Sequence, residues 1–510
     1  MKNYLRKRIY KWHRITGLIV ALPVVLWTLS GFLHPVMNAF KPEVNNSLPP
    51  IVIDTSRIKL SLDQALNMHH IESIRNFRII EKHGAFYYQV KQPGADTLTY
   101  ISCYNGQLMV NGDQQYAAYL AQRYVSDPNG SKGDHHSGAA ADLATVVKKS
   151  TSNNHHNKAN ILDVQLVKEY STEYKRSNVY LPVYRVLFDR DDELRLYIET
   201  STGKLATAID GKRSLYIHFF ALTHSWSFLD GMGMIKHIII GFLSILCFLT
   251  SLFGFIVYNI IGKTKKPLAK NRSWHRTMGN VFVVTTLLYA FSGGWHSLHK
   301  INNEENAQVQ KQNEFRVNEL DLPLHAIAGK LKKDQQLSGI SVVRMNERNF
   351  WQVSTINKGK LQKRYFETKT LGDIKGGDEA YGRYLASELA GKPITSISHS
   401  KPIYKFNDRY SMMKKRLPVV EVSFGEDDNY YVETSTGYLS AVSSPADQAE
   451  RFSFSNLHMH HYWEDWFGKE KGKALKNIVL IASTLGLLLL AITGVLMYLR
   501  KRRKLRATSF

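Results

Sequence analysis

Four segments of this 510-residue chain contain no Asp, Glu, Lys or Arg over about the length that a bilayer requires. They cover residues 15–34, 237–261, 277–298 and 477–499. One such segment would be compatible with a buried helix of a soluble domain. Each of the four, however, is bounded on one side by a dense basic run. We therefore predict four transmembrane helices, and the fold class is that of a membrane α-helical protein.

The basic runs predict how the chain is oriented. Residues 1–14, 262–276 and 500–510 each carry six Lys or Arg residues and no acidic residue. Under the positive-inside rule these segments lie on the cytoplasmic face, so both termini are cytoplasmic. The connections 35–236 and 299–476 then lie on the opposite face, and each is long enough to fold as a domain.

The formal net charge of +24 would by itself suggest nucleic acid as a partner. Most of the excess lies in the three cytoplasmic segments. We therefore interpret it as a topology signal and as contact with anionic membrane lipid, and we exclude nucleic acid. The chain has two cysteines, Cys103 and Cys247, which excludes a disulfide framework, a Cys-rich metal centre and a CxxCH haem attachment.

The sequence also repeats itself. Trp12-His13-Arg14 at the first helix recurs as Trp274-His275-Arg276 at the third, 262 residues later. The same offset relates three further pairs, namely Gly17 and Gly279, Ser30 and Ser292, and His34 and His296. The run Tyr-Ile-Glu-Thr-Ser-Thr-Gly that begins at Tyr197 recurs, with Val for Ile, from Tyr431. Each half is thus helix, external domain, helix, which makes a duplicated 2+2 parallel repeat.

The two external segments alternate apolar and polar residues in short runs that end near Gly, as at residues 86–90 and 99–106. This pattern predicts two small α+β domains with antiparallel sheets. The stretch 126–160 is rich in Ser, Asn, Gly and Asp, and we expect a mobile loop there. For its doublets, His135-His136 and His155-His156, we expect at most adventitious metal binding.

Histidine at the edge of a membrane span is a functional candidate, because its burial is costly. His13 and His275 lie near the cytoplasmic ends of the first and third helices, and His34 and His296 lie near the outer ends. The two histidines of each helix are 21 residues apart, roughly 31 Å of rise, which is about one bilayer thickness. A twofold axis along the membrane normal would bring each pair together.

Two imidazoles from facing helices, one pair near each membrane face, form the arrangement that ligates b-type haem. We therefore predict two haem b groups, with His13 and His275 as ligands at the inner site and His34 and His296 at the outer site. Several other histidines near the outer face could replace the outer ligands. These are His224, His237 and His461 in the first place, and also His218, His299, His458 and His460. Of these, His224 and His461 match each other in the duplication.

Three further features accompany the histidines. Arg14 and Arg276 are candidates to pair with haem propionates. Trp27 and Tyr289 lie between the two depths, where packing is the simpler explanation for them than electron transfer. Interfacial Trp, His and Arg also suit the headgroup layer without any cofactor, and this explanation stays open.

The Trp-His-Arg tripeptide before an apolar span that ends in Ser-Gly, together with the Glu-Thr-Ser-Thr-Gly domains, resembles the PepSY-associated transmembrane family. That family includes iron-regulated inner-membrane proteins and ferric-siderophore reductases. The resemblance implies a bacterial inner membrane, two extracytoplasmic α+β PepSY-like domains, and haem-dependent electron delivery to ferric siderophores. His13 and His275 match the family pattern best. The chain has no GxGxxG loop in a βαβ context, so the expected electron donor is a separate cytoplasmic protein or a membrane quinol.

Two other classes of function stay open. In the first, the PepSY-like domains bind or regulate an envelope partner without redox chemistry, and the histidines only pack. In the second, the protein transports haem or a metal, and the histidines are transient ligands.

Overall fold

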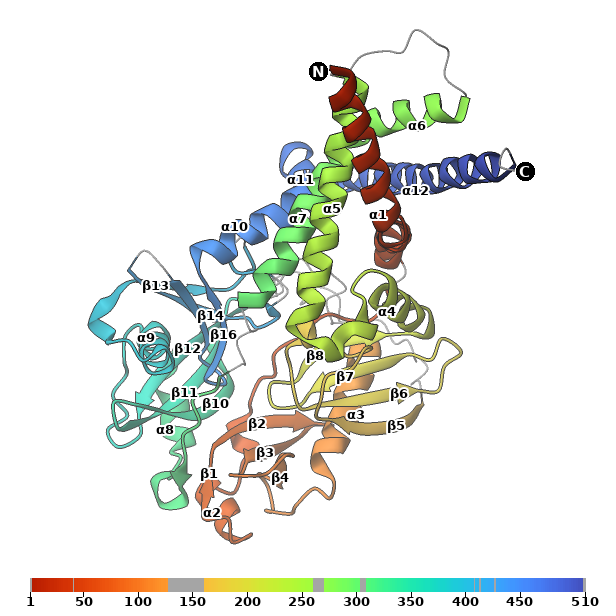
Figure 1. The fold of residues 1–510 in the computed structure, drawn as a ribbon. Coiled ribbons are helices and arrows are strands. Elements are labelled where there is room, and N and C mark those ends of the chain that lie inside the picture. Colours follow the sequence, from red (N-terminus) through yellow and green to blue (C-terminus); the bar gives the residue numbers. More distant parts are fainter. Residues whose placement is uncertain are drawn as a thin grey trace. The chain divides into compact units, whose positions relative to one another are not determined.

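The computed structural model describes residues 2–39, 41–126, 160–259, 270–302, 309–407, 409–411, 414–425 and 428–507. Residues 127–159 of the expected mobile loop, with both histidine doublets, and residues 262–269 of the basic loop lie outside the described residues. The chain forms two compact units (Figure 1). A helical unit comprises Met1–Lys41, Lys212–Glu305 and Pro445–Phe510, and a sheet unit comprises Pro42–Gly211 and Asn306–Ser444. The ends of both predicted external segments therefore belong with the helices.

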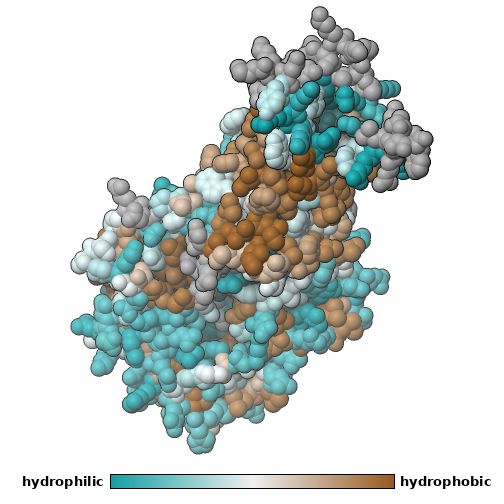
Figure 2. Space-filling model, in the orientation of Figure 1, coloured by the Kyte–Doolittle hydropathy of each residue, from teal (hydrophilic) through white to brown (hydrophobic). Residues whose placement is uncertain are grey.

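Long apolar helices dominate the helical unit. They are α1 (Lys2–Ala39), α5 (Met234–Asn259) and α12 (Lys469–Ala507). Among the described residues these three helices are long and apolar enough to cross a membrane, and a bent pair, α6 and α7, makes a fourth if it is one span. Figure 2 shows apolar surface gathered over these helices and hydrophilic surface where α1 begins. The chain is a membrane protein by this pattern; four complete spans stay a prediction.

The third predicted span is bent where the sequence predicts a continuous helix. Helix α6 (Lys270–Val281) meets α7 (Val283–Asn302) at 60°. The carbonyl of Phe282 accepts hydrogen bonds from the hydroxyls of Thr285 (3.0 Å) and Thr286 (2.7 Å), and such back-bonding bends helices. The Phe282 ring also packs where a Cβ on Gly486 of α12 would overlap it. The bend places His275 on a separate short helix.

Short helices precede α5 and α12 in the helical unit. Helix α4 (Gly211–Thr223) and the 3₁₀ turn η4 (Ser227–Met232) come before α5. Helix α10 (Pro445–Ser453), the π turn η8 (Phe454–His458) and α11 (Tyr462–Phe467) come before α12. Helix α1 packs on α5 and α12, and α5 packs on α7.

The sheet unit contains two series of elements in the same order: a short helix, a three-stranded meander, a longer helix and a four-stranded meander, all antiparallel. The first series is α2 (Leu62–Asn67), β2 (Asn76–Lys82), β3 (Ala85–Lys91), β4 (Thr99–Ser102), α3 (Gly112–Ser126), β5 (Ile161–Val167), β6 (Val183–Phe188), β7 (Arg195–Glu199) and β8 (Lys204–Ile209). The second is α8 (Leu324–Gly329), β10 (Gln335–Met345), β11 (Arg348–Asn357), β12 (Lys360–Glu367), α9 (Gly377–Ala390), β13 (Ile397–Ile403), β14 (Val419–Phe424), β15 (Asp428–Glu433) and β16 (Tyr438–Ser443). Short 3₁₀ turns lie at Thr55–Arg57, Arg176–Asn178, Val317–Glu319 and Ile394–Ser396.

The two series share one core. Strand β1 (Ser73–Ile74) pairs with β9 (Phe315–Arg316), and β2 lies beside β10. The Phe77 ring packs edge-on against the fully buried Trp351, with centroids 6.2 Å apart. The external segments therefore form one compact unit built from both halves of the chain, and the predicted α+β character with antiparallel sheets is present.

A buried polar chain recurs in both series. In the first, the Gln89 amide donates to the Tyr100 hydroxyl (2.5 Å), which donates to Asp113 (2.9 Å). In the second, Gln352 donates to Tyr365 (2.5 Å), which donates to Asp378 (2.7 Å). Such chains satisfy polar groups that would otherwise be costly to bury, so they fix the longer helix against the meander in each series.

The repeated Glu-Thr-Ser-Thr-Gly run has a structural role at the junction of the two series. Glu433 is fully buried and pairs with Lys204 (2.8 Å) from the first series and with Arg416 (2.7 Å) from its own. Burial disfavours the charged form of Glu433, but the two cations outweigh it and hold the pKa of its carboxyl well below the ordinary value. The run thus joins the two series electrostatically.

Candidate functional site

The inner pair of predicted histidines lies together in the helical unit. His13 of α1 and His275 of α6 face each other edge-on, with ring centroids 6.4 Å apart. The His13 Nδ1 is 2.9 Å from the carbonyl oxygen of Thr250, and the His275 Nδ1 is 3.1 Å from the hydroxyl of Thr493. Each ring is therefore oriented by a neighbouring helix, α5 for His13 and α12 for His275.

The acceptors determine which nitrogen of each ring carries the proton. A carbonyl only accepts, so the His13 Nδ1 donates to Thr250. The Thr493 hydroxyl already donates to the carbonyl of Leu489 (2.7 Å), so it accepts from the His275 Nδ1. Both Nε2 atoms then carry the lone pair. A histidine whose Nδ1–H is bound in this way is oriented to ligate a metal through Nε2.

Two glycines of the duplicated sequence make room for the inner rings. A Cβ on Gly254 of α5 would lie 3.2 Å from Cε1 of His13, and a Cβ on Gly494 of α12 would lie 3.5 Å from Cε1 of His275. Both glycines begin the matching runs Gly-Phe-Ile-Val-Tyr and Gly-Val-Leu-Met-Tyr. The helix backbone can approach each imidazole closely because these positions have no side chain.

The candidate propionate partners differ in their surroundings. Arg14 is exposed. Arg276 lies over the Tyr258 ring at 5.1 Å, and its Nε is buried with no hydrogen-bond partner in the part of the chain that the structure describes. A buried guanidinium nitrogen of this kind is suited to an anionic group.

A second imidazole pair lies at the outer end of the helical unit. His224 follows α4 and His458 ends η8, and their ring centroids are 6.2 Å apart. The His224 Nδ1 bonds to the Ser30 hydroxyl (2.9 Å), and the His458 Nδ1 bonds to the Ser292 hydroxyl (3.1 Å). Both serines donate to carbonyls of their own helices, so both accept from the imidazoles. The outer pair therefore repeats the spacing and tautomer of the inner pair.

Burial supports the neutral form of the outer ring on η8. Desolvation, and secondarily the imidazoles around it, lower the pKa of His458 to about 3. His458 is therefore neutral at physiological pH, which is the form that binds a metal.

The histidines expected at the outer end of α1 and α7 flank this pair. His34 lies beside the Phe220 ring (6.2 Å), and Phe220 stacks on His224 (4.5 Å). In the same way His296 lies beside Phe454 (4.6 Å), which stacks on His458 (5.0 Å). The Nδ1 of His296 is 2.5 Å from Glu450. The rings that approach each other are thus those of His224 and His458.

The predicted equivalence of His224 and His461 is wrong. The structural equivalent of His224 is His458, because both stack on a Phe four residues earlier and both bond to the repeated Ser. The ring of His461 instead meets Lys476 and Glu464, each at 3.4 Å. The sequence contains a signal for the correct match, since an offset of 234 residues relates Tyr197 to Tyr431 and also His224 to His458.

The remaining outer histidines have other partners. The nearest contacts are His237 with Ser297 (3.1 Å from the hydroxyl to the backbone carbonyl of His237), His299 with Asp447 (2.8 Å), His218 with the carbonyl of Ser214 (2.8 Å), and His460 with the Tyr289 hydroxyl (2.9 Å). Burial, and then His461, lower the pKa of His460 to about 4. These contacts give each of the four rings a local hydrogen-bonding role.

The two aromatic residues between the depths differ in their contacts. Trp27 stacks on Trp226 with centroids 5.5 Å apart, two residues beyond His224. Tyr289 lies 5.4 Å from the His458 ring, and its hydroxyl bonds to Ser483 (2.7 Å). Both side chains pack next to the outer pair, which agrees with a packing role.

The residues present fit a b-type haem at each pair. Two imidazoles that ligate one iron through Nε2 at about 2 Å stand with ring centroids roughly 6 Å apart. The observed separations are 6.4 Å and 6.2 Å. The lone-pair nitrogens and the buried Arg276 Nε are the donor set that such a group requires.

Comparison with protein families agrees with these observations. The family model for the PepSY-associated transmembrane region matches residues 10–501. The chain therefore belongs to the PepSY-associated transmembrane family. No curated protein sequence matches the chain.

Proposed function

We propose that this protein is a haem-containing oxidoreductase of the bacterial inner membrane that reduces ferric siderophores on the extracytoplasmic side and so releases their iron. The observation that carries the proposal is the pair of matching imidazole pairs, with ring centroids 6.4 Å and 6.2 Å apart and every Nδ1 held by an oxygen acceptor. A merely packed interfacial histidine has no reason to share tautomer and spacing with three others.

His13 and His275 would hold the inner haem b, and His224 and His458 would hold the outer one. The geometry favours this outer pair over His34 and His296, which flank it. A bound haem supplies a one-electron carrier at each position. The contribution of the chain is to orient the four rings, to keep them neutral, and to exclude water with the aromatic side chains around them.

Arg276 is the better candidate of the two arginines for a propionate, because its Nε is buried without a partner among the described residues. Electrons would enter from a cytoplasmic protein or a membrane quinol, with both chain termini in the cytoplasm. Ferric iron in the siderophore is the substrate: it accepts one electron and becomes Fe(II), which hard oxygen ligands bind more weakly.

The test is reoxidation of the dithionite-reduced protein by a ferric trihydroxamate chelate, followed at the Soret band by stopped flow. We expect the chelate to reoxidise the protein faster than buffer alone, and the Fe(II) formed to be trapped by ferrozine. Reoxidation at the buffer rate would refute the substrate assignment. A colourless protein would refute the haem assignment and favour the non-redox binding role or the transporter.

A further inference from the structure

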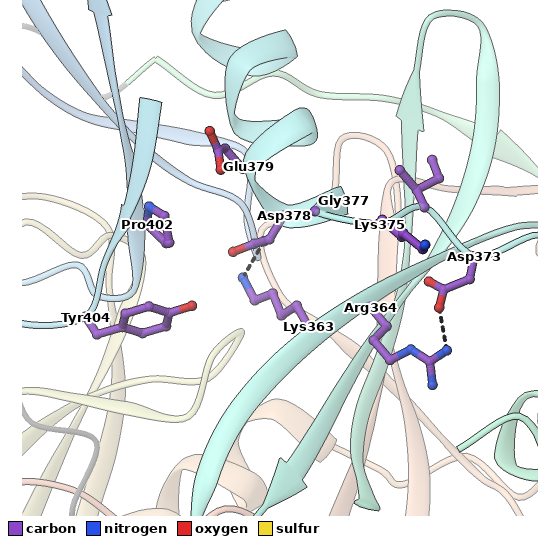
Figure 3. A pocket seen from close by; sticks show the side chains of 11 residues that line it. Lys363, Arg364, Asp373, Lys375, Gly377, Asp378, Glu379, Pro402 and Tyr404 are labelled. Atoms are coloured by element: carbon purple, nitrogen blue, oxygen red, sulfur yellow. Dashed lines mark hydrogen bonds and ion pairs between the residues drawn. The ribbon is translucent and has the colours of Figure 1, made fainter. Parts of the chain in front are cut away.

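The second series of the sheet unit has a charged cavity of about 290 Å³ at the start of α9. Figure 3 shows its lining side chains, which come from β12, from the loop before α9, from the first turn of α9 and from the end of β13. The polar ones that matter below are Lys363, Arg364, Lys375, Asp378, Glu379 and Tyr404. None of these residues takes part in the imidazole pairs.

The corresponding place in the first series has apolar side chains instead. The buried Gln–Tyr–Asp chain aligns the two series, so Tyr365 corresponds to Tyr100 and Gly377 to Gly112. Two residues before these positions, Leu98 corresponds to Lys363 and Val110 to Lys375. Two ammonium groups have therefore replaced two hydrocarbon side chains on the same backbone frame, and the frame itself does not require them.

The acidic groups of the cavity already have partners within the protein. Asp378 accepts from Tyr365 (2.7 Å) and from the hydroxyl of Thr434 (2.6 Å), and it is 3.6 Å from the Lys363 ammonium. Glu379 accepts from Ser400 (2.5 Å). Asp373 pairs with Arg364. These bonds neutralise the carboxylates locally.

Hydrogen-bond donors face the interior. The Lys363 side chain is 7% exposed, and its ammonium donates to Thr434 (2.6 Å) at the base of the cavity. In Figure 3 the Tyr404 hydroxyl points toward Lys363 and Asp378. Burial and Asp378 raise the pKa of Tyr404, so its hydroxyl keeps its proton. Helix α9 begins after Gly376 (φ 67°), a residue without a side-chain cap, so the positive end of its dipole is at the cavity.

We propose that this cavity binds the carboxylate group of a small organic acid, held by the Lys375 ammonium, the Tyr404 hydroxyl and the first turn of α9. Three protein carboxylates in the wall disfavour a dianion such as phosphate, whereas a single planar monoanionic group meets the donors with less repulsion. The site goes beyond the proposed reductase activity and does not depend on bound haem.

The test is calorimetric titration of the full-length protein in detergent with succinate at low ionic strength. We expect saturable binding that is about tenfold weaker in Lys375→Gln and in Tyr404→Phe. Lys369→Gln removes an exposed lysine of the same domain that does not line the cavity, and it should bind succinate like the wild type.

The outcomes separate cleanly. Absence of saturable succinate binding, or equal weakening by Lys369→Gln, would overturn the proposal. Tighter binding of inorganic phosphate than of succinate would overturn the ligand class. Because haem content and chelate reduction are measured separately, their failure would leave this result standing, and the reverse also holds.

Discussion

The inner and outer imidazole pairs have nearly the same spacing but are built from different parts of the repeat. His13 and His275 lie on the first membrane helix of each half and are 262 residues apart. His224 and His458 lie in the segments that lead into α5 and α12 and are 234 residues apart. The comparison teaches that a duplicated chain can build two equivalent sites because equivalent residues become neighbours, whichever element carries them.

The two pairs differ in how their rings are held. At the outer end the acceptors are equivalent hydroxyls, those of Ser30 and Ser292. At the inner end one acceptor is the Thr250 backbone carbonyl and the other is the Thr493 hydroxyl. Substitution can therefore remove both outer acceptors but only one inner acceptor.

The largest effect is expected from removing one ring of each pair. His275→Ala and His458→Ala should each lower the haem content from about two per chain to about one, because an iron bound by a single imidazole is held more weakly. The pyridine haemochrome assay measures the loss. His34→Ala is the matched control, and it should keep both haems. Loss of a haem in His34→Ala with none in His458→Ala would reverse the assignment of the outer ligands.

Removal of the acceptors should have a smaller effect. Ser292→Ala leaves the His458 Nδ1–H without its hydroxyl acceptor, and loss of such a partner weakens metal affinity by about 10–100-fold. Thr493→Val should do the same to the inner site through His275. Haem transfer to apomyoglobin would report the two affinities. Equal retention of haem by wild type and both variants would contradict the orienting role.

The inner glycines provide a finer comparison. Gly254→Ala would place a Cβ 3.2 Å from the His13 ring, which is tighter than ordinary contact, whereas Gly494→Ala would place one 3.5 Å from His275. Overpacking of this kind costs about 1–3 kcal/mol. We therefore expect Gly254→Ala to loosen the inner haem more than Gly494→Ala does, as a larger shift in midpoint potential. Equal shifts would show that the two rings are not crowded differently.

The smallest effect on haem is expected from the sheet unit. Glu433→Gln breaks a buried ion pair with Lys204 and Arg416, and such a loss costs about 3–5 kcal/mol of the free energy of unfolding. Chemical denaturation followed by tryptophan fluorescence measures it, and haem content should stay unchanged. Because the pKa of Glu433 is lowered on folding, its contribution is present above the pKa of the unfolded carboxyl, about 4.3, and is lost as the pH falls toward the lower folded value. An unchanged stability would contradict the linking role of this residue.

The sequence predicts the family, the apolar helices, the antiparallel α+β domains and the meeting of His13 with His275. It predicts the last because one constant offset relates the Trp-His-Arg tripeptides. The outer pairing of His224 with His458 was missed, because the offset there is 234 residues and the nearby His-His-Tyr-Trp run drew the match to His461.

Two other features depend on contacts between distant residues. The bend at Phe282 arises from the hydroxyls of Thr285 and Thr286 and from packing near Gly486, and an apolar run does not reveal this geometry. The Ser30 and Ser292 acceptors likewise look like ordinary small residues of a membrane helix until the rings are placed beside them.

The central claim is that the four rings form two bis-imidazole haem sites. The most direct measurement is the haem-to-polypeptide ratio of the wild-type protein, purified from membranes of cells supplied with a haem precursor, together with its reduced-minus-oxidised spectrum. The account predicts about two b-type, low-spin haems per chain. A colourless protein, or one with haem at a small fraction of the polypeptide, would contradict it.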